Sequence, residues 1–193
     1  MRLDRVEVRK LALRLKTPFE TSVGRITTKE FLLVSVYDAG MSGHGECVAD
    51  VDAFYLPETN ATVYPILRDF LVPMVFALDL RHPREVRPAL ARVRGHEMAK
   101  ASLEMAVWDL MAHVEGRPLY DMLGGGGGPV EAGVSVGLQD DDARLVERVV
   151  VVADQLVTVR AHPVVRPDVV VSVLMHPIAV VHGRAPVRRR FPL

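Results

Sequence analysis

The clearest structural signal in the chain lies in Met98–Glu115, which reads MAKASLEMAVWDLMAHVE. Apolar residues recur in this stretch at steps of three and four, the period of one buried face of an α-helix. They are Ala99, Leu103, Ala106, Val107, Leu110, Met111 and Val114, with Trp108 beside them. Gly116 and Pro118 follow and predict the end of the helix. The sequence therefore predicts a long helix that packs by one face, with Trp108 as a packing residue.

Three stretches with β-strand character precede this helix. Apolar and charged residues alternate over residues 6–15, and two further β-rich runs cover residues 31–37 and 43–48. Turn-forming residues interrupt the pattern at Thr17–Gly24, which we expect to be a loop. Three successive strands joined by short turns favour an antiparallel three-stranded meander. Together with the helices, they predict an α+β domain.

Two further helices are predicted between the strands and the long helix. Thr59 or Asn60 can cap the first, which runs to about Leu71. Pro65 lies inside it, and a proline in a helix interior costs roughly 3 kcal/mol. This helix is therefore expected either to start late, near Thr62, or to kink. The second candidate covers residues 83–94.

A run of five glycines, Gly124–Gly128, predicts a boundary or a flexible joint. Beyond it we expect a strand over residues 130–138 and a helix that begins near Asp140–Asp142, because acidic side chains favour a helix N-terminus. The expected apolar face of that helix comprises Leu145, Val146, Val149, Val150, Ala153 and Leu156. A strand and then a helix, after a helical region, is how an α/β barrel begins. The predicted organisation is an α+β domain over 1–125, one β/α unit over 126–156, and a tail over 157–193.

Composition and charge exclude several classes of protein. The 193 residues are 49% hydrophobic and carry a formal net charge of +0, so no overall field attracts nucleic acid or an anionic membrane. The apolar runs are too short to cross a bilayer, and the N-terminal residues lack the apolar core of a signal peptide. The single cysteine, Cys47, rules out an intramolecular disulfide. We expect a cytoplasmic protein with no nucleic-acid or membrane partner.

Six short motifs occur in a fixed order along residues 1–150. They are Thr17–Ser22 (TPFETS), Gly43–Cys47 (GHGEC), Tyr55–Thr59 (YLPET), Met98–Asp109 (MAKASLEMAVWD), Gly116–Tyr120 (GRPLY) and Ala132–Gly137 (AGVSVG). Together, the set resembles the o-succinylbenzoate synthase / N-acylamino acid racemase branch of the enolase superfamily. The resemblance implies that residues 1–125 form a capping domain and that an α/β (β/α) barrel follows it, incomplete in this chain.

The same resemblance implies a small set of substrate-binding residues. Phe19 and Tyr55 match apolar walls of the family's substrate pocket, and Ser135 matches a polar substrate contact at the end of the first barrel strand. Asp50 stands where relatives commonly carry an apolar pocket residue. Each position has a structural alternative, in which Phe19 anchors a loop and Ser135 is an ordinary strand residue.

The chemistry implied by the family is removal of a proton from the carbon next to a carboxylate in a small-molecule substrate. A divalent cation, usually Mg²⁺, stabilises the negative charge that develops on the carboxylate oxygens. Three acidic side chains on barrel strands bind this ion in the family, and lysines act as acid and base.

The acidic and lysine residues that this chemistry needs are missing from the later part of the chain. Lys100 is the last lysine, Glu147 is the last glutamate, and residues 157–193 contain a single acid, Asp168. Arg160 occupies the region expected for a Lys-x-Lys motif, but its guanidinium stays protonated at any workable pH. The sequence therefore predicts no catalytic residue and no metal ligand in this chain.

Residues 157–193 are rich in Val, Arg, Pro and His. Translation in an altered reading frame is one hypothetical cause of this bias. The spacings of His162, His176 and His182 match no standard metal-ligand set. Short buried strands are predicted at 164–165, 169–174 and 178–181.

Three hypotheses remain open from the sequence. The first is a truncated or interrupted o-succinylbenzoate synthase-like protein whose relatives perform a dehydration in menaquinone biosynthesis or racemise N-acylamino acids, with a homo-oligomer left open. The second is a non-catalytic binding or interaction module derived from the capping domain. The third is a chain that does not form a stable protein.

Overall fold

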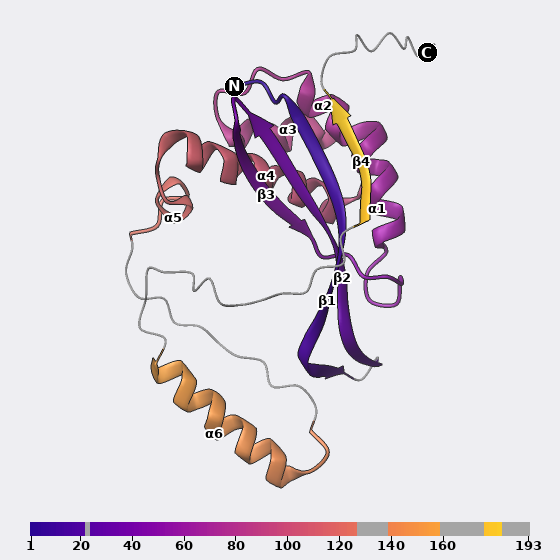
Figure 1. Cartoon of the computed structure of the whole chain (residues 1–193), viewed down its shortest axis with the longest axis vertical. Helices are drawn as coiled ribbons and strands as arrows, with labels where there is room; N and C mark the ends of the chain where they lie inside the picture. The colour runs from indigo at the N-terminus through magenta and orange to yellow at the C-terminus, as the bar shows by residue number, and fades with distance from the viewer. Residues whose placement is uncertain (22–23, 127–138, 159–175, 183–193) are drawn as a thin grey trace.

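The computed structural model describes residues 1–21, 24–126, 139–158 and 176–182 (Figure 1). Its first three strands are β1 (Arg5–Thr21), β2 (Gly24–Asp38) and β3 (Met41–Cys47). Each pairs antiparallel with the next, so the predicted three-stranded meander is confirmed. Helices cover one face of this sheet (Figure 1). The arrangement confirms the predicted α+β fold of the N-terminal region.

The hairpin formed by β1 and β2 extends further than predicted. The segment Thr17–Gly24 was expected to be a loop, but β1 continues to Thr21, and Phe19 pairs with Ile26. The loop prediction was therefore wrong for most of this segment. An irregularity in register between Arg14 and Phe19 contains Pro18, which has no amide hydrogen to donate to a ladder. Regular pairing resumes beyond the proline.

A fourth strand, β4 (His176–His182), extends the sheet to the order β3-β2-β1-β4. It pairs antiparallel with β1, with Arg5 opposite His182 and Lys10 opposite His176. This strand confirms the one predicted at 178–181. The strands predicted at 164–165 and 169–174 lie outside the described residues.

The helix after β3 contains its proline and changes to a π-helical segment just beyond it. α1 (Asn60–Ile66) begins with a capping box, in which Thr62 N–H donates to the Thr59 hydroxyl at 3.2 Å and Thr59 N–H donates to the Thr62 hydroxyl at 2.9 Å. The helix therefore begins at Asn60, and the predicted late start near Thr62 was wrong. Pro65 cannot donate to the carbonyl one turn earlier, and the chain continues as a π-helical segment, η1 (Leu67–Leu71), before α2 (Val72–Phe76).

The single helix predicted over residues 83–94 was also wrong. This stretch forms a 3₁₀ turn, η2 (Pro83–Glu85), a short helix, α3 (Val86–Ala89), and a second 3₁₀ turn, η3 (Leu90–Arg92). Pro88 lies within α3 and lacks the amide hydrogen that would continue a regular helix.

The long helix is confirmed as α4 (Glu97–Glu115), and Gly116, with φ of 61°, ends it as predicted. A short helix, α5 (Leu119–Met122), follows. The helix expected after the three aspartates is confirmed as α6 (Asp142–Thr158), whose Leu145, Val146, Val149 and Val150 are exposed. The strand predicted at 130–138 lies outside the described residues. In the described part of the chain, no helix has the length and apolar character needed to span a bilayer.

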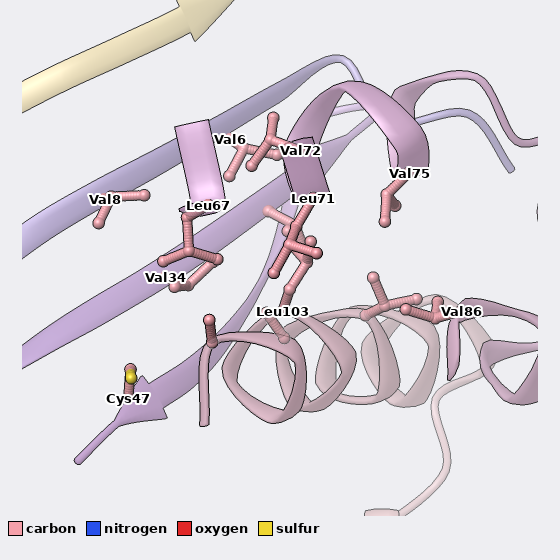
Figure 2. Close-up of a cluster of buried hydrophobic side chains, with 14 of the residues drawn as sticks. Val6, Val8, Val34, Cys47, Leu67, Leu71, Val72, Val75, Val86 and Leu103 are labelled. Carbon is pink, nitrogen blue, oxygen red and sulfur yellow. The ribbon is translucent and has the colours of Figure 1, made fainter. Parts of the chain in front are cut away.

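The core lies between the sheet and the helices (Figure 2). Val6 and Val34 point from the sheet toward Leu67 and Leu71. Leu103 of α4 belongs to the same cluster and completes it from the helix layer. All five side chains are at most 2% exposed. Trp108 is also buried and meets the His82 ring edge-on at a centroid distance of 5.3 Å, which confirms its packing role.

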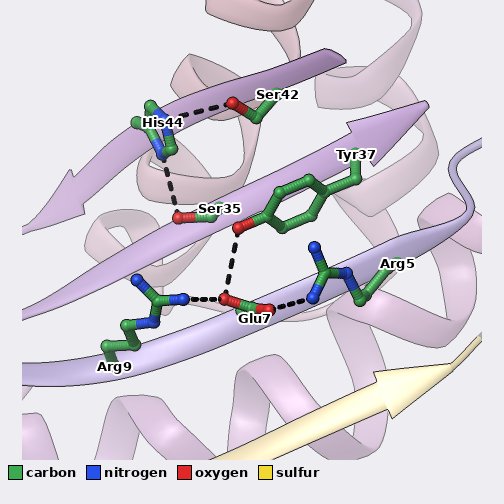
Figure 3. A network of polar contacts seen from close by, with 7 residues as sticks. All are labelled: Arg5, Glu7, Arg9, Ser35, Tyr37, Ser42 and His44. Carbon is green, nitrogen blue, oxygen red and sulfur yellow. Dashed lines mark hydrogen bonds and ion pairs between the residues drawn. The ribbon is translucent and has the colours of Figure 1, made fainter. Parts of the chain in front are cut away.

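The opposite face of the sheet carries a polar network (Figure 3). The buried carboxylate of Glu7 accepts hydrogen bonds from Arg5, Arg9 and the Tyr37 hydroxyl, the last at 3.2 Å. The Arg5 guanidinium also lies 3.8 Å from the centre of the Tyr37 ring. Because its carboxylate also accepts from Tyr37 of β2, Glu7 helps to hold β1 to β2.

Candidate functional site

Two exposed segments lie at the end of the sheet far from the N-terminus (Figure 1). The first, the outer hairpin, comprises residues 15–21 and 24–28 of β1 and β2, and it carries Phe19, which is 46% exposed. The second, the aromatic loop, comprises residues 51–57 after β3, and its Phe54 and Tyr55 are 82% and 77% exposed. Large apolar side chains exposed in one region are typical of a binding surface.

The aromatic loop is tied to β2 at its base. Lys29 Nζ lies 2.5 Å from Asp50 Oδ1, just before the loop. At the other end, the Asn60 amide N–H donates to the Asp50 carbonyl at 2.9 Å, and the Asn60 side-chain amide donates to the Glu30 carbonyl at 3.2 Å. Asp50 and Thr59 form an isolated β-bridge that closes the loop. The ends of the loop are therefore fixed to the sheet while its tip is exposed.

Glu58 ties the end of the loop to the long helix. Its carboxylate accepts hydrogen bonds from the amide N–H groups of Met98 at 3.0 Å and Ala99 at 3.2 Å, in the first turn of α4. The side chain is buried, and the free amides of a helix N-terminus favour a negative charge at this place. The sequence shows Glu58 only as part of the Tyr55–Thr59 motif, because no local pattern relates it to a helix that starts 39 residues later.

A Glu58→Gln substitution tests this contact. Glutamine keeps the size but replaces a charged acceptor of two hydrogen bonds by a neutral amide with one oxygen, which leaves a buried N–H of α4 poorly satisfied. We expect the free energy of unfolding to fall by about 1–3 kcal/mol. Urea denaturation measures the change, and Glu46→Gln, at an exposed residue of β3, is the control. Equal stability of the two variants would contradict the role given to Glu58.

The structure places the predicted substrate residues as follows. Phe19 lies on the outer hairpin and Tyr55 on the aromatic loop, at the same end of the sheet. Ser135 lies outside the described residues. Asp50, which stands where relatives commonly carry an apolar pocket residue, is engaged with Lys29 at the base of the loop.

Two other reactive groups in the six motifs are engaged in packing. Lys100 is 4% exposed and donates from Nζ to Glu97 Oε1 at 3.0 Å; this bond, followed by that from Arg87, lowers the pKa of the Glu97 carboxyl. Burial raises the pKa of the Cys47 thiol, so this cysteine stays protonated at neutral pH and is a poor nucleophile. Neither side chain is presented to the outer hairpin or the aromatic loop as a catalytic group.

A divalent cation has no evident site among the residues that the structure describes. No group of three or more His, Cys, Asp and Glu side chains is placed there to hold a metal ion. Among the carboxylates at this end of the sheet, Asp50 is paired with Lys29, Glu58 accepts from the α4 amides, and Glu20 lies near Arg25. The described residues therefore do not fit a bound Mg²⁺.

Comparison with known proteins places this arrangement in a family. Residues 5–124 match the model of the mandelate racemase / muconate lactonizing enzyme N-terminal domain. An o-succinylbenzoate synthase from Geobacillus kaustophilus is 44% identical over 165 residues, which are 83% of this chain and 44% of that protein. An N-succinylamino acid racemase from Thermus thermophilus is 44% identical over 151 residues, 77% of this chain and 41% of that protein. These relatives confirm the resemblance drawn from the six motifs.

Solved structures agree with these sequence matches. An enolase-superfamily member from Listeria innocua superposes with a TM-score of 0.74 at 33% identity, over 80% of this chain and 42% of that chain. A mandelate racemase / muconate lactonizing enzyme homologue from Roseovarius nubinhibens was solved in complex with magnesium. It superposes with a TM-score of 0.68 at 25% identity, over 79% of this chain and 42% of that chain. The chain thus spans less than half the length of the relatives it matches.

Proposed function

Because the chain belongs to the mandelate racemase / muconate lactonizing enzyme family, we propose that residues 1–125 act as the substrate-covering domain of an o-succinylbenzoate synthase-like protein. The observation that carries this proposal is the pair of segments at one end of the sheet that expose Phe19, Phe54 and Tyr55, with the aromatic loop anchored at both ends. Such segments can close over a small carboxylate and exclude water from it.

In this proposal, Phe19 and Tyr55 are apolar walls of the substrate pocket, and Ser135 is a polar contact. Residues 126–156 are the first β/α unit of a barrel, and residues 157–193 are a diverged tail. The family reaction needs a divalent cation, with Mg²⁺ the usual ion, to stabilise charge on the substrate carboxylate. The described residues offer that ion no ligand set, so we assign no catalytic residue and no metal ligand to this chain.

The relatives carry two activities in their names, a synthase and a racemase. Both are consistent with proton removal beside a carboxylate, and the covering domain we propose would serve either substrate. We propose a cytoplasmic protein without a nucleic-acid or membrane partner, and a homo-oligomer remains open. A second candidate is a non-catalytic module that binds small carboxylates. It is favoured by the exposed aromatic loop, together with the absence of a metal-ligand cluster among the described residues.

A binding and turnover experiment on the whole chain tests these assignments. With Mg²⁺ present, we expect neither formation of o-succinylbenzoate nor racemisation of N-succinylamino acids above background, and no rise in melting temperature on adding the metal. Titration with o-succinylbenzoate, followed by NMR, should shift amide signals of the outer hairpin and the aromatic loop. Tyr55→Ala should weaken these shifts, whereas Phe70→Ala, at a residue 50% exposed on η1, should leave them unchanged.

Three outcomes would count against the proposal. Turnover comparable to that of intact relatives, or stabilisation by Mg²⁺, would contradict the assignment of no catalytic residue and no metal ligand. Shifts located elsewhere, or equal effects of the two alanine variants, would contradict a substrate-covering role for this end of the sheet.

A further inference from the structure

Lys29 occupies the junction between the regular part of the β1–β2 ladder and the outer hairpin. It lies opposite Leu13, and the next pair, Arg14 with Thr28, is the last before the register irregularity. Beyond this point the register shifts, and pairing resumes only at Phe19 with Ile26. Movement of the hairpin relative to the sheet would therefore pivot close to Lys29.

Asp50 occupies the equivalent place at the base of the aromatic loop. It is the residue before the loop, and its backbone carbonyl accepts the N–H of Asn60 at the other end of the loop. Its carboxylate points to Lys29, with 2.5 Å between Nζ and Oδ1. A single ion pair thus joins the base of one exposed segment to the base of the other.

The strength of this ion pair fits an adjustable connection. Both side chains are 32% exposed, so they keep part of their hydration and the attraction between them is moderate. Added salt weakens such a pair, because the Debye length falls from about 8 Å at physiological ionic strength to about 3 Å at 1 M. The two hydrogen bonds that Asn60 donates, one from its backbone and one from its side chain, do not depend on charge and remain.

We propose that the Lys29–Asp50 ion pair couples the outer hairpin to the aromatic loop, so that Phe19 and Tyr55 form one wall. Lys29 and Asp50 are then positioning residues, since they act through the segments that they join. That this wall covers a small carboxylate rests on the proposed function. The coupling itself is a property of the free chain and can be measured without any ligand.

Hydrogen exchange on the full chain, read by mass spectrometry, tests the coupling. Asp50→Asn and Lys29→Met should each raise the exchange rate about two- to fivefold in both the outer hairpin and the aromatic loop. The charge-reversed double variant, Lys29→Asp with Asp50→Lys, should restore slow exchange in both. Raising the salt to 1 M should speed exchange in the native chain and leave Asp50→Asn unchanged.

Lys10→Met provides a matched control, because Lys10 Nζ pairs with Glu30 at 2.5 Å on the same two strands but does not contact the loop. It should leave exchange in the aromatic loop unchanged. Urea denaturation of every variant separates local opening from global unfolding. The proposal is overturned if Asp50→Asn affects the loop alone, if the charge reversal fails to restore slow exchange, or if Lys10→Met has the same effect. Failure of substrate binding with the coupling intact would reject the proposed function and leave this inference standing.

Discussion

A Gly45→Ala substitution is expected to lower the free energy of unfolding by about 3 kcal/mol, although it adds one methyl group. A Cβ atom at Gly45 would lie 2.0 Å from the Ser102 carbonyl oxygen and 2.8 Å from the Ala106 amide nitrogen. Both are backbone atoms of α4, far inside the separation of about 3.5 Å at which nonbonded atoms attract. Neither can rotate away, so the helix must move off β3 and disturb the core behind it. Thermal or urea denaturation of the variant measures the loss.

Gly24→Ala is the control for this prediction. Gly24 is also a strand glycine, at the start of β2, and a Cβ atom there would meet no described residue other than its chain neighbours within 4 Å. Its substitution should change stability by less than about 0.5 kcal/mol. Similar stability of the two variants would show that α4 does not press against β3 as closely as the structure has it.

Leu103→Ala is expected to destabilise the chain by about 2–5 kcal/mol, because it opens a cavity between α4 and the sheet. Leu103 is fully buried and lies in the cluster with Val34 and Leu71 (Figure 2). Neighbouring side chains of a close-packed core collapse only in part around such a cavity. The free energy of unfolding from urea denaturation is the measurement.

Met105 offers the matched comparison, since it lies two residues away on the same helix and is 45% exposed. Met105→Ala should cost less than about 0.5 kcal/mol. If both variants lose the same free energy of unfolding, the buried face of α4 has been assigned wrongly.

Predictions from the sequence were best where a local pattern spans many residues. The three- and four-residue period of α4 and its terminal Gly116 located the helix to within one residue at its start, Glu97. The three strands of the meander were also correct, since alternation identifies a half-buried strand. The effects of Pro65 and Pro88 were harder to predict. A proline removes a backbone hydrogen bond, but it does not determine whether the helix ends, widens to a π-helix or tightens to a 3₁₀ turn.

The site residues also separate into those that a local motif indicates and those that only the structure shows. The motifs directed attention to Phe19 and Tyr55, and the structure places both on exposed segments at one end of the sheet. The partners of Asp50 and Glu58 lie 21 and at least 40 residues away in the sequence, so no local pattern could reveal them. The sequence shows Asp50 only as a departure from the family's apolar residue, and the structure shows its ion pair with Lys29.

The amino-acid sequence by itself determined the order and type of the main elements, the family resemblance, and the shortage of lysines and acids in the later part of the chain. Periodicity and composition are local properties, and they can be read without knowing which segments meet. The tertiary structure decided why Gly43 and Gly45 are glycines, how the aromatic loop is anchored, and that residues 176–182 join the edge of β1. Those features depend on contacts between segments distant in the chain, where the close approach of backbones and the pairing of charges are set by packing.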